Sequence, residues 1–320
     1  MKQISFSIIV TCFNQSAFIR ETIESACNQT YPAKEVIVVD DASTDESSRI
    51  LSEYRDQITL ICCHENGGPS AGRNLGASSA EGDYLVFLDG DDVLQPWALE
   101  VYWRIIDIKQ PKVILGTLLY FRGPTVAGSS LYFRSKIPVT NHDEVPSDIW
   151  ILKYSRISDK DREYRACAST MVVERRIFQR ADGWTRELFP AEDYDLMVKL
   201  ACCGPIIQVE FPPTICYRMH AGSIMHKVPQ SAAMLCKVLM GASLGAYRKH
   251  GVGRLDAYSI LGGPAWFWFT LALRSKHYGS ALEVFIWGLP AMVVAMVRRL
   301  VVLVGGQRFP EALPGLADRN

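Results

Sequence analysis

Tyr84-Leu85-Val86-Phe87-Leu88-Asp89-Gly90-Asp91-Asp92 is the stretch of sequence that decides the fold. Its first five residues are apolar, and a short apolar run of this kind is typical of a buried strand. Three carboxylates follow within four residues, although burying even one unpaired carboxylate costs several kcal/mol. Hard divalent cations take oxygen ligands, so a cation site would give these carboxylates a use. The stretch therefore predicts a strand that ends at a polar, metal-binding edge.

Composition and charge indicate two parts in a globular chain of 320 residues, of which 48% are apolar and 21% charged. Residues 227–320 contain 11 Lys and Arg against 4 Asp and Glu, a net charge of +7, which leaves −7 for residues 1–226. We expect an acidic catalytic domain in residues 1–226 and an apolar, basic helical region in residues 227–320. The basic residues are dispersed among apolar runs, so no nucleic-acid partner is predicted.

The cysteines and the start of the sequence indicate a reducing compartment. Nine cysteines are scattered without a disulfide framework or the spacing of a zinc site. The strand-like residues 4–11 come too early and are too short for a signal peptide. We therefore expect a cytoplasmic location.

Strand-like and helix-like segments alternate along the first part of the chain. The strand-like runs are residues 4–11, 35–41, 58–63, 84–88 and 113–119, and the helix-like segments between them are residues 16–28, 70–79 and 96–108. This alternation predicts an α/β fold with a doubly wound, mostly parallel sheet, which binds ligands outside the carboxyl ends of its strands. Residues 11–14, 40–41 and 89–91 fall at such ends, so we expect them to share one crevice.

Seven short segments together resemble a known family. They are residues 7–14, 35–45, 68–76, 82–92, 183–184, 192–196 and 217–220. In this order they are similar to family 2 glycosyltransferases, and the resemblance covers residues 4–225. It implies the GT-A fold, a Rossmann-like sheet flanked by helices, here followed by a C-terminal helical appendage. It also implies inverting transfer of one sugar from a nucleotide-diphosphate sugar to a hydroxyl acceptor, in the synthesis of cell-surface glycans or polysaccharides.

The resemblance assigns a metal site to the quoted stretch. Asp89 and Asp91 match the family's Asp-x-Asp motif, which implies Mn²⁺ or Mg²⁺ as cofactor. We expect Asp91 to bind the metal directly, and Asp89 to contact the ribose or to reach the metal through water. His220 is expected to complete the metal site or to contact the diphosphate.

Further residues match the family's nucleotide-sugar pocket. They are Thr11, Phe13, Asn14, Asp41, Arg73, Asp89, Gly90, Trp184 and Arg218. Phe13 would supply an aromatic surface for the base, and Asp41 would accept a hydrogen bond from it. Asp41 and Arg73 match positions that read uracil, which favours a UDP-sugar. Alternatives stay open, since Phe13 and Trp184 also suit a core, Asp41 also suits helix capping after its strand, and Arg73, Arg218 and His220 also suit structural or solvated positions.

Asp193 resembles the catalytic base of inverting members, which removes the proton of the acceptor hydroxyl. Glu192 is its neighbour and could take the same role. The alternative for both is stabilisation of a helix N-terminus by a carboxylate.

Two other functions fit the same fold. A nucleotidyltransferase would carry a Gly-rich, basic loop after the first strand, but residues 12–16 read Cys-Phe-Asn-Gln-Ser. A non-catalytic sugar-binding module would be indicated by loss of Asp91 or Asp193, and both are present. The Gln-x-x-Arg-Trp motif of processive synthases is absent, which favours transfer of one sugar per binding event.

The C-terminal region contains two uncharged runs, residues 260–273 and 284–297, each shorter than the roughly 20 residues of a membrane span. One interpretation is a helical region that binds a membrane surface, so that the protein is peripheral at the inner face and acts on a glycan or lipid-linked acceptor. The other is a soluble appendage that packs on the catalytic domain or forms a homodimer.

Overall fold

The computed structural model describes residues 4–126, 130–132, 150–154, 167–220, 227–305 and 311–312. Among these residues the larger sheet has nine strands in the order β13-β9-β11-β6-β10-β4-β1-β2-β3. They are β1 (Phe6–Cys12), β2 (Glu35–Asp40), β3 (Thr59–Cys62), β4 (Tyr84–Asp89), β6 (Val113–Leu115), β9 (Trp150–Tyr154), β10 (Met171–Glu174), β11 (Ile206–Phe211) and β13 (Glu311–Ala312). Only β9 and β10 run against the common direction of these strands, so the predicted, mostly parallel sheet is confirmed.

A smaller sheet corrects one predicted strand. It comprises β5 (Val93–Leu94), β12 (Ile215–Arg218), β7 (Leu118–Arg122) and β8 (Ser130–Tyr132). The single strand predicted at 113–119 is two strands, β6 and β7, in different sheets. The chain leaves the larger sheet at Thr117, which exchanges hydrogen bonds with Thr214 just before β12.

Helices cover both faces of the larger sheet because apolar side chains alternate along its strands. Ile8, Val38 and Val86 belong to the core cluster shared with α1 (Ile19–Cys27), α2 (Ser47–Ser52) and α4 (Ala98–Lys109). Ile9 and Phe87 belong to the cluster on the opposite face, which includes α3 (Pro69–Ser79), α5 (Arg175–Arg180) and α6 (Glu192–Lys199). The residues between these elements include the short 3₁₀ helices η2 (Ala168–Thr170) and η3 (Arg186–Leu188).

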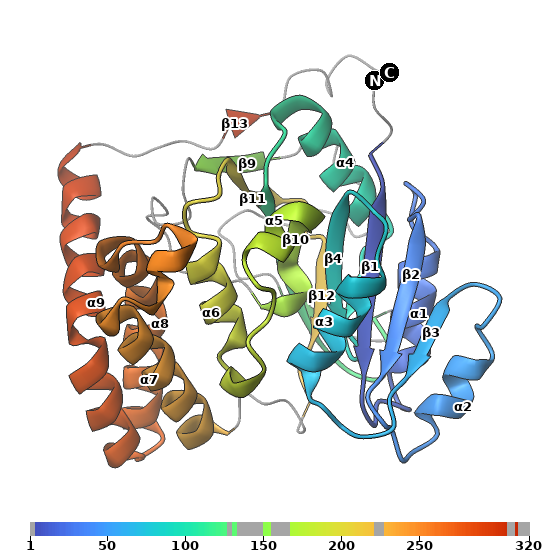
Figure 1. Cartoon of the computed structure of the whole chain (residues 1–320), viewed down its shortest axis with the longest axis horizontal. Coiled ribbons are helices and arrows are strands. Elements are labelled where there is room, and N and C mark those ends of the chain that lie inside the picture. The colour runs from blue at the N-terminus through green and yellow to red at the C-terminus, as the bar shows by residue number, and fades with distance from the viewer. Residues whose placement is uncertain are drawn as a thin grey trace.

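The C-terminal region is helical, as predicted. It contains α7 (Val228–Leu244), the 3₁₀ helix η5 (Ala246–His250), α8 (Arg254–Arg274) and α9 (Tyr278–Gly305). Figure 1 shows these helices beside α6, on the side of the sheet away from β3. Leu235, Leu261 and Val284 lie in the same core cluster as Leu196 of α6, so the C-terminal helices pack directly on α6. The predicted boundary at residue 226 lies outside the described residues.

Candidate active site

Three polar strand ends meet at one edge of the sheet. Thr11 of β1 pairs with Val39 of β2 on one side and with Asp89 of β4 on the other, and Cys12 pairs with Asp40. The main-chain N–H of Asp41 donates to the carbonyl of Cys12 at 2.8 Å. The predicted convergence of residues 11–14, 40–41 and 89–91 is therefore present in the fold.

Arg73 links this edge to the helix that carries the predicted base. Its guanidinium is buried and donates to Asp89 Oδ1 at 2.6 Å and to Glu192 Oε1 at 2.9 Å. Burial alone would lower the pKa of the Arg73 guanidinium, but the two carboxylates outweigh it and hold that pKa above its usual value. Arg73 therefore stays charged and ties the end of β4 to the N-terminus of α6.

Four buried polar atoms near this link have no hydrogen-bond partner among the described residues. They are Ser70 Oγ, Arg73 Nε, Trp184 Nε1 and Glu192 Oε2. Buried polar groups in folded proteins are nearly always paired, so unpaired donors and acceptors indicate a missing partner. Water or the hydroxyl groups of a sugar would supply one.

The two carboxylates at the start of α6 both resist ionisation. The pKa of the Asp193 carboxyl is raised well above its usual range. The main cause is loss of solvent around the carboxyl group, and the second is the negative charge of the neighbouring Glu192. Burial also raises the pKa of Glu192, although Arg73 opposes this effect. A carboxylate with a raised pKa is a stronger base toward a hydroxyl proton, so Asp193 suits the predicted role.

The pH dependence of transfer follows from these directions. Asp193 is active as a base only when ionised, so kcat/KM for the acceptor should fall as the pH drops through its raised pKa. Glu192→Gln removes a like charge, and we expect it to move this acid limb to lower pH. The measurement is a pH profile of transfer for both proteins. An unmoved limb would contradict the coupling between the two carboxylates.

The residues predicted to bind the nucleotide base lie on two loops, and hydrogen bonds join these loops to each other. Phe13 is 44% exposed, which excludes the alternative that it is a plain core residue. Asn14 Oδ1 accepts hydrogen bonds from the backbone N–H groups of Thr44 and Asp45 at 2.8 and 3.3 Å. The loop after β1 is therefore held against the loop after β2, and it presents an aromatic ring beside the sheet edge.

Asp41 has a structural partner at this edge. Its two carboxylate oxygens accept hydrogen bonds from the backbone N–H groups of Gly67 and Gly68, both at 2.8 Å. The side chain is buried, so it orders the loop that leads into α3. Each oxygen keeps a second lone pair, and the predicted contact with a base stays a prediction.

Asp91 and His220 form a close pair at the end of the loop after β4. His220 Nε2 lies 2.8 Å from Asp91 Oδ2, and both side chains are partly exposed. Asp89 lies two residues away but is held by Arg73. No group of three or more Asp, Glu, His or Cys side chains arranged to hold a metal ion is found within the described residues. The protein would thus provide two ligands to a metal ion, one carboxylate and one imidazole.

Gly90 and Asp92 shape the loop after β4, which carries Asp91. A Cβ on Gly90 would lie 2.7 Å from the carbonyl oxygen of Thr11, so this position has no room for a side chain. Asp92 is buried and accepts hydrogen bonds from Ser169 Oγ at 2.6 Å and from the Arg218 N–H at 3.0 Å. Asp92 therefore fixes the loop after β4 to β12 and η2.

Arg218 is enclosed by protein. Its guanidinium donates to the main-chain carbonyls of Asp91, Gly123 and Pro124 and to Glu21 Oε2, at 2.6–2.8 Å. The group also lies over the rings of Phe18 and Phe121, 4.6 and 4.5 Å from their centres. All three nitrogens are occupied, so the geometry favours a role in positioning Asp91 over the phosphate contact that the resemblance implies.

Arg218→Gln is expected to destabilise the fold by about 3 kcal/mol, because it leaves Glu21 and three carbonyls without their buried partner. The measurement is urea unfolding. Arg20→Gln is the matched control, since it breaks an exposed ion pair with Glu53 and should change little. Equal stability of the two variants would contradict the positioning role of Arg218.

Trp184 belongs to the core beneath Arg73. It is 2% exposed, its ring meets Phe87 edge-on at 5.2 Å, and the Arg73 guanidinium lies 4.8 Å from its centre. The two interpretations left open by the sequence both apply in part, because the side chain is packed in the core and the residue also contributes to the wall of a hollow next to α6. Its unpaired Nε1 still leaves one donor for a buried ligand or water.

Comparison with known proteins places this geometry in a family. The model of the family "Glycosyl transferase family 2" matches residues 7–183, more than half of the chain. The chain belongs to glycosyltransferase family 2. This assignment favours glycosyl transfer over the nucleotidyltransferase alternative.

Two relatives and one solved structure illustrate the range of similarity to this glycosyltransferase. WfaP of Escherichia coli, a "UDP-Glc:alpha-D-GlcNAc-diphosphoundecaprenol beta-1,3-glucosyltransferase", is 29% identical over 80% of this chain and 93% of its own length. TarS of Staphylococcus aureus, a "Poly(ribitol-phosphate) beta-N-acetylglucosaminyltransferase", is 35% identical over 115 residues. That match covers 34% of this chain and only 20% of TarS.

The structural comparison confirms the GT-A fold. The crystal structure of S. aureus TarS 1-349 in complex with UDP-GlcNAc superimposes with a TM-score of 0.57. It covers 94% of this chain and 92% of that chain at 18% sequence identity, so it supports the fold alone.

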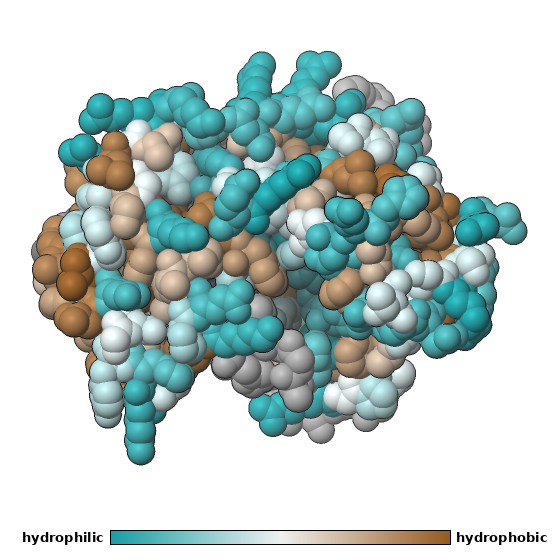
Figure 2. All heavy atoms as spheres, turned by 60° about the horizontal axis from the view of Figure 1, so that its bottom comes forward, coloured by the Kyte–Doolittle hydropathy of each residue, from teal (hydrophilic) through white to brown (hydrophobic). Residues whose placement is uncertain are grey.

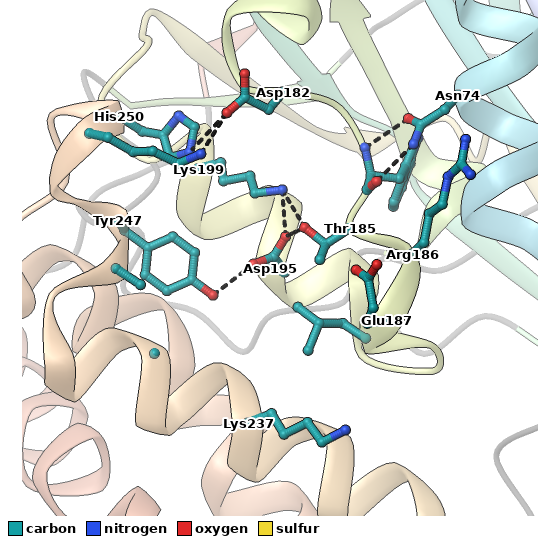
Figure 3. Close-up of a pocket in the computed structure, with 15 residues that line it drawn as sticks. Asn74, Asp182, Thr185, Arg186, Glu187, Asp195, Lys199, Lys237, Tyr247 and His250 are labelled. Carbon is teal, nitrogen blue, oxygen red and sulfur yellow. Dashed lines mark hydrogen bonds and ion pairs between the residues drawn. The ribbon is translucent and has the colours of Figure 1, made fainter.

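A hollow of about 440 Å³ is lined by residues of η3 and α6 on one side and of α7 and η5 on the other (Figure 3). None of the predicted donor or metal residues except Trp184 lines it. At its wall, Asp195 of α6 accepts hydrogen bonds from Thr185 Oγ1 at 2.6 Å and from Tyr247 Oη at 2.7 Å, and pairs with Lys199. Tyr247 thus attaches η5 to the helix that carries Asp193.

A second contact supports the same helix. Trp268 Nε1 of α8 donates to Tyr194 Oη at 3.2 Å. The helix α6 has only eight residues and no side-chain N-cap, so contacts of this kind are needed to hold it. Sequence reasoning missed Tyr247, Trp268, Glu21 and Ser169, because their partners are 52 to 197 residues away.

Tyr247→Phe is expected to lower kcat about tenfold without changing donor affinity, since small displacements of a catalytic group cost rate. The measurement is steady-state kinetics with varied donor and acceptor. Tyr258→Phe is the control, because it loses a hydroxyl bonded to Ser243 within the C-terminal helices. If both variants kept the wild-type kcat, the support of α6 by η5 would have no role in catalysis.

Proposed function

We propose that this protein is an inverting glycosyltransferase that moves one sugar from a UDP-sugar to a hydroxyl group of a glycan or lipid-linked acceptor. The observation that carries the proposal is the Asp89–Arg73–Glu192 link. It brings the donor end of the sheet next to Asp193, although these groups are far apart in the sequence. One site thereby combines donor residues with a base of raised pKa, which is what a single displacement requires.

The choice of donor rests on the loops after β1 and β2. The exposed ring of Phe13 offers a stacking surface for the nucleotide base. The carboxylate of Asp41 can still accept a hydrogen bond from that base. Among the relatives, WfaP is named for UDP-Glc, and TarS has been crystallised with UDP and with UDP-GlcNAc. These names support a UDP-sugar here, and the name of WfaP supports a diphosphate-lipid acceptor.

The side chains of Asp91 and His220 are suitable ligands for a divalent cation. Mg²⁺ is usually held by one or two carboxylates together with substrate phosphates and water, and Mn²⁺ also accepts imidazole. Two protein donors are therefore enough when a diphosphate supplies further oxygens. Bound there, Mn²⁺ or Mg²⁺ would neutralise charge on the leaving diphosphate. Asp89 would then remain with Arg73, near the ribose.

The residues of this chain divide the reaction between them. Asp193 accepts the proton of the acceptor hydroxyl while the oxygen of that hydroxyl bonds to the anomeric carbon. The bond between that carbon and the diphosphate oxygen breaks, and its electrons leave with UDP. Attack from the opposite face inverts the configuration, so no enzyme nucleophile is required.

The proposal is tested by a donor screen followed by product analysis. UDP-, GDP- and dTDP-sugars are compared by calorimetry with and without Mn²⁺, and the favoured donor is offered to polyprenyl-diphosphate sugars. We expect UDP-sugars to bind, and the new glycosidic bond to have the opposite anomeric configuration by NMR. Retention of configuration, or absence of binding by any nucleotide sugar, would refute the proposal.

We further propose that this reaction serves cell-surface glycan synthesis at the cytoplasmic side of the membrane. The relatives named above act on a diphosphate-lipid sugar and on poly(ribitol-phosphate). A lipid-linked acceptor would require the enzyme to work close to a bilayer.

A further inference from the structure

The outer face of α9 carries a continuous apolar stripe. We define the stripe as Leu282, Phe285, Ile286, Leu289, Val293 and Val297, which are between 41% and 60% exposed. Their spacing of one, three or four residues keeps them on one side of the helix. Figure 2 shows hydrophobic side chains gathered at the edge of the molecule where α9 lies in Figure 1. Soluble monomers rarely expose so long an apolar surface without a partner.

The opposite side of α9 is fixed against the protein. Ala281, Val284 and Ala291 are buried in the core shared with α7 and α8. A Cβ on Gly262 of α8 would lie 2.4 Å from the carbonyl oxygen of Ala291, so the two backbones are in close contact. Residues 278–297 are long and apolar enough to cross a membrane, and five of these 20 residues are buried. Crossing would pull the attached helices into the bilayer, so this packing favours a helix that lies on the surface.

The charges around the stripe favour an anionic surface. Arg274 and Lys276 are exposed next to its start. Gly262 faces Ala291 and Gly288 faces Ala265, so α8 and α9 are antiparallel and Arg254 lies near the other end. Glu283 is the single charged residue in 278–297. Two stripes packed together in a dimer would bring basic ends onto basic ends in either orientation, which disfavours a second copy.

We propose that the stripe docks on a bilayer that contains anionic lipids, with α9 in the plane of the surface. The apolar side chains enter the boundary between headgroups and acyl chains, and the basic ends contact anionic headgroups. The charge of −7 on residues 1–226 disfavours adsorption of the catalytic part and leaves the stripe as the contact. The surface needs no nucleotide sugar, so this proposal is independent of the proposed reaction.

Co-sedimentation with vesicles tests the docking. The full chain is mixed, without donor, with vesicles of phosphatidylcholine alone or with 30% phosphatidylglycerol. We expect binding to the anionic vesicles, weakened by salt. The double variant Ile286→Glu/Val293→Glu should lose at least about tenfold in binding, because charges cannot enter the apolar boundary. Arg274→Gln/Lys276→Gln should lose about 25-fold, from about fivefold for each cation.

Ile108→Glu provides the matched control, since Ile108 is 48% exposed on α4, away from the stripe. It should bind vesicles as the wild type does. Equal binding by this variant and the stripe variant, or no binding to either vesicle, would overturn the proposal. A dimer in light scattering that the stripe variant dissociates, without vesicle binding, would assign the stripe to a second copy. Resistance of the bound protein to alkaline extraction would assign α9 to a membrane span.

Discussion

Asp193→Asn is expected to lower kcat for glycosyl transfer about 1000-fold or more while leaving the affinity for the UDP-sugar within about twofold. Asparagine keeps the shape of the side chain but cannot accept the proton of the acceptor hydroxyl, and a positioned base contributes roughly 100- to 10,000-fold to such reactions. Donor affinity should persist because Asp89, Arg73 and Glu192 are unchanged. Calorimetry with the donor and a transfer assay measure the two quantities separately.

Asp107→Asn is the matched control for this variant, since it makes the same chemical change on an exposed part of α4. It should transfer at the wild-type rate. If Asp193→Asn retained a rate near that of the control, the base would have to be assigned elsewhere, with Glu192 the first alternative. Loss of rate together with loss of donor binding would instead point to damage at the donor site.

Asp91→Asn is expected to weaken Mn²⁺-dependent binding of UDP at least about 100-fold. Loss of residues that only orient metal ligands typically costs roughly 10- to 100-fold, so loss of a charged ligand should cost at least as much. His220, whose Nε2 lies 2.8 Å from Asp91 Oδ2, would then be the one remaining ligand of this pair for the metal. Calorimetric titration of UDP with and without Mn²⁺ measures the effect, and the difference between the two conditions should nearly vanish in the variant.

Asp107→Asn again serves as the control, and it should keep the full difference between the two conditions. His220→Ala is expected to show a smaller loss, because it removes an imidazole ligand and leaves the carboxylate. UDP affinity that is the same with and without Mn²⁺ in the wild type would exclude metal-dependent binding altogether. The Asp91–His220 pair would then be a hydrogen bond that closes the loop after β4.

The sequence predicted the parts of the site that strands carry. Apolar runs that end in Asp40-Asp41 and Asp89-Gly90-Asp91 place those residues at a sheet edge by the rule of parallel strands alone. The same reasoning failed at residues 113–119, because Thr117 pairs with Thr214 on a distant segment. Local pattern contains no information about such a partner.

Tertiary structure distinguished residues that the sequence had treated alike. Arg73 and Arg218 both match contacts with the donor, but Arg73 links two carboxylates of the site while Arg218 is enclosed by carbonyls and rings. Phe13 and Trp184 both suited either a pocket or a core, and their exposures of 44% and 2% separate them. Burial depends on every neighbouring segment, so no single motif could decide it.

By itself, then, the sequence determined the α/β fold and the strand ends that carry the predicted donor-binding residues, and it predicted the base to be one of two adjacent acids. These follow from periodicity and from short motifs, which act within a few residues. Only the tertiary structure decided that Tyr247 and Trp268 contact α6, that Arg73 joins Asp89 to Glu192, and that the apolar side of α9 faces outward. The physical reason is that hydrogen bonds, burial and pKa shifts depend on groups that folding brings together from distant positions in the chain.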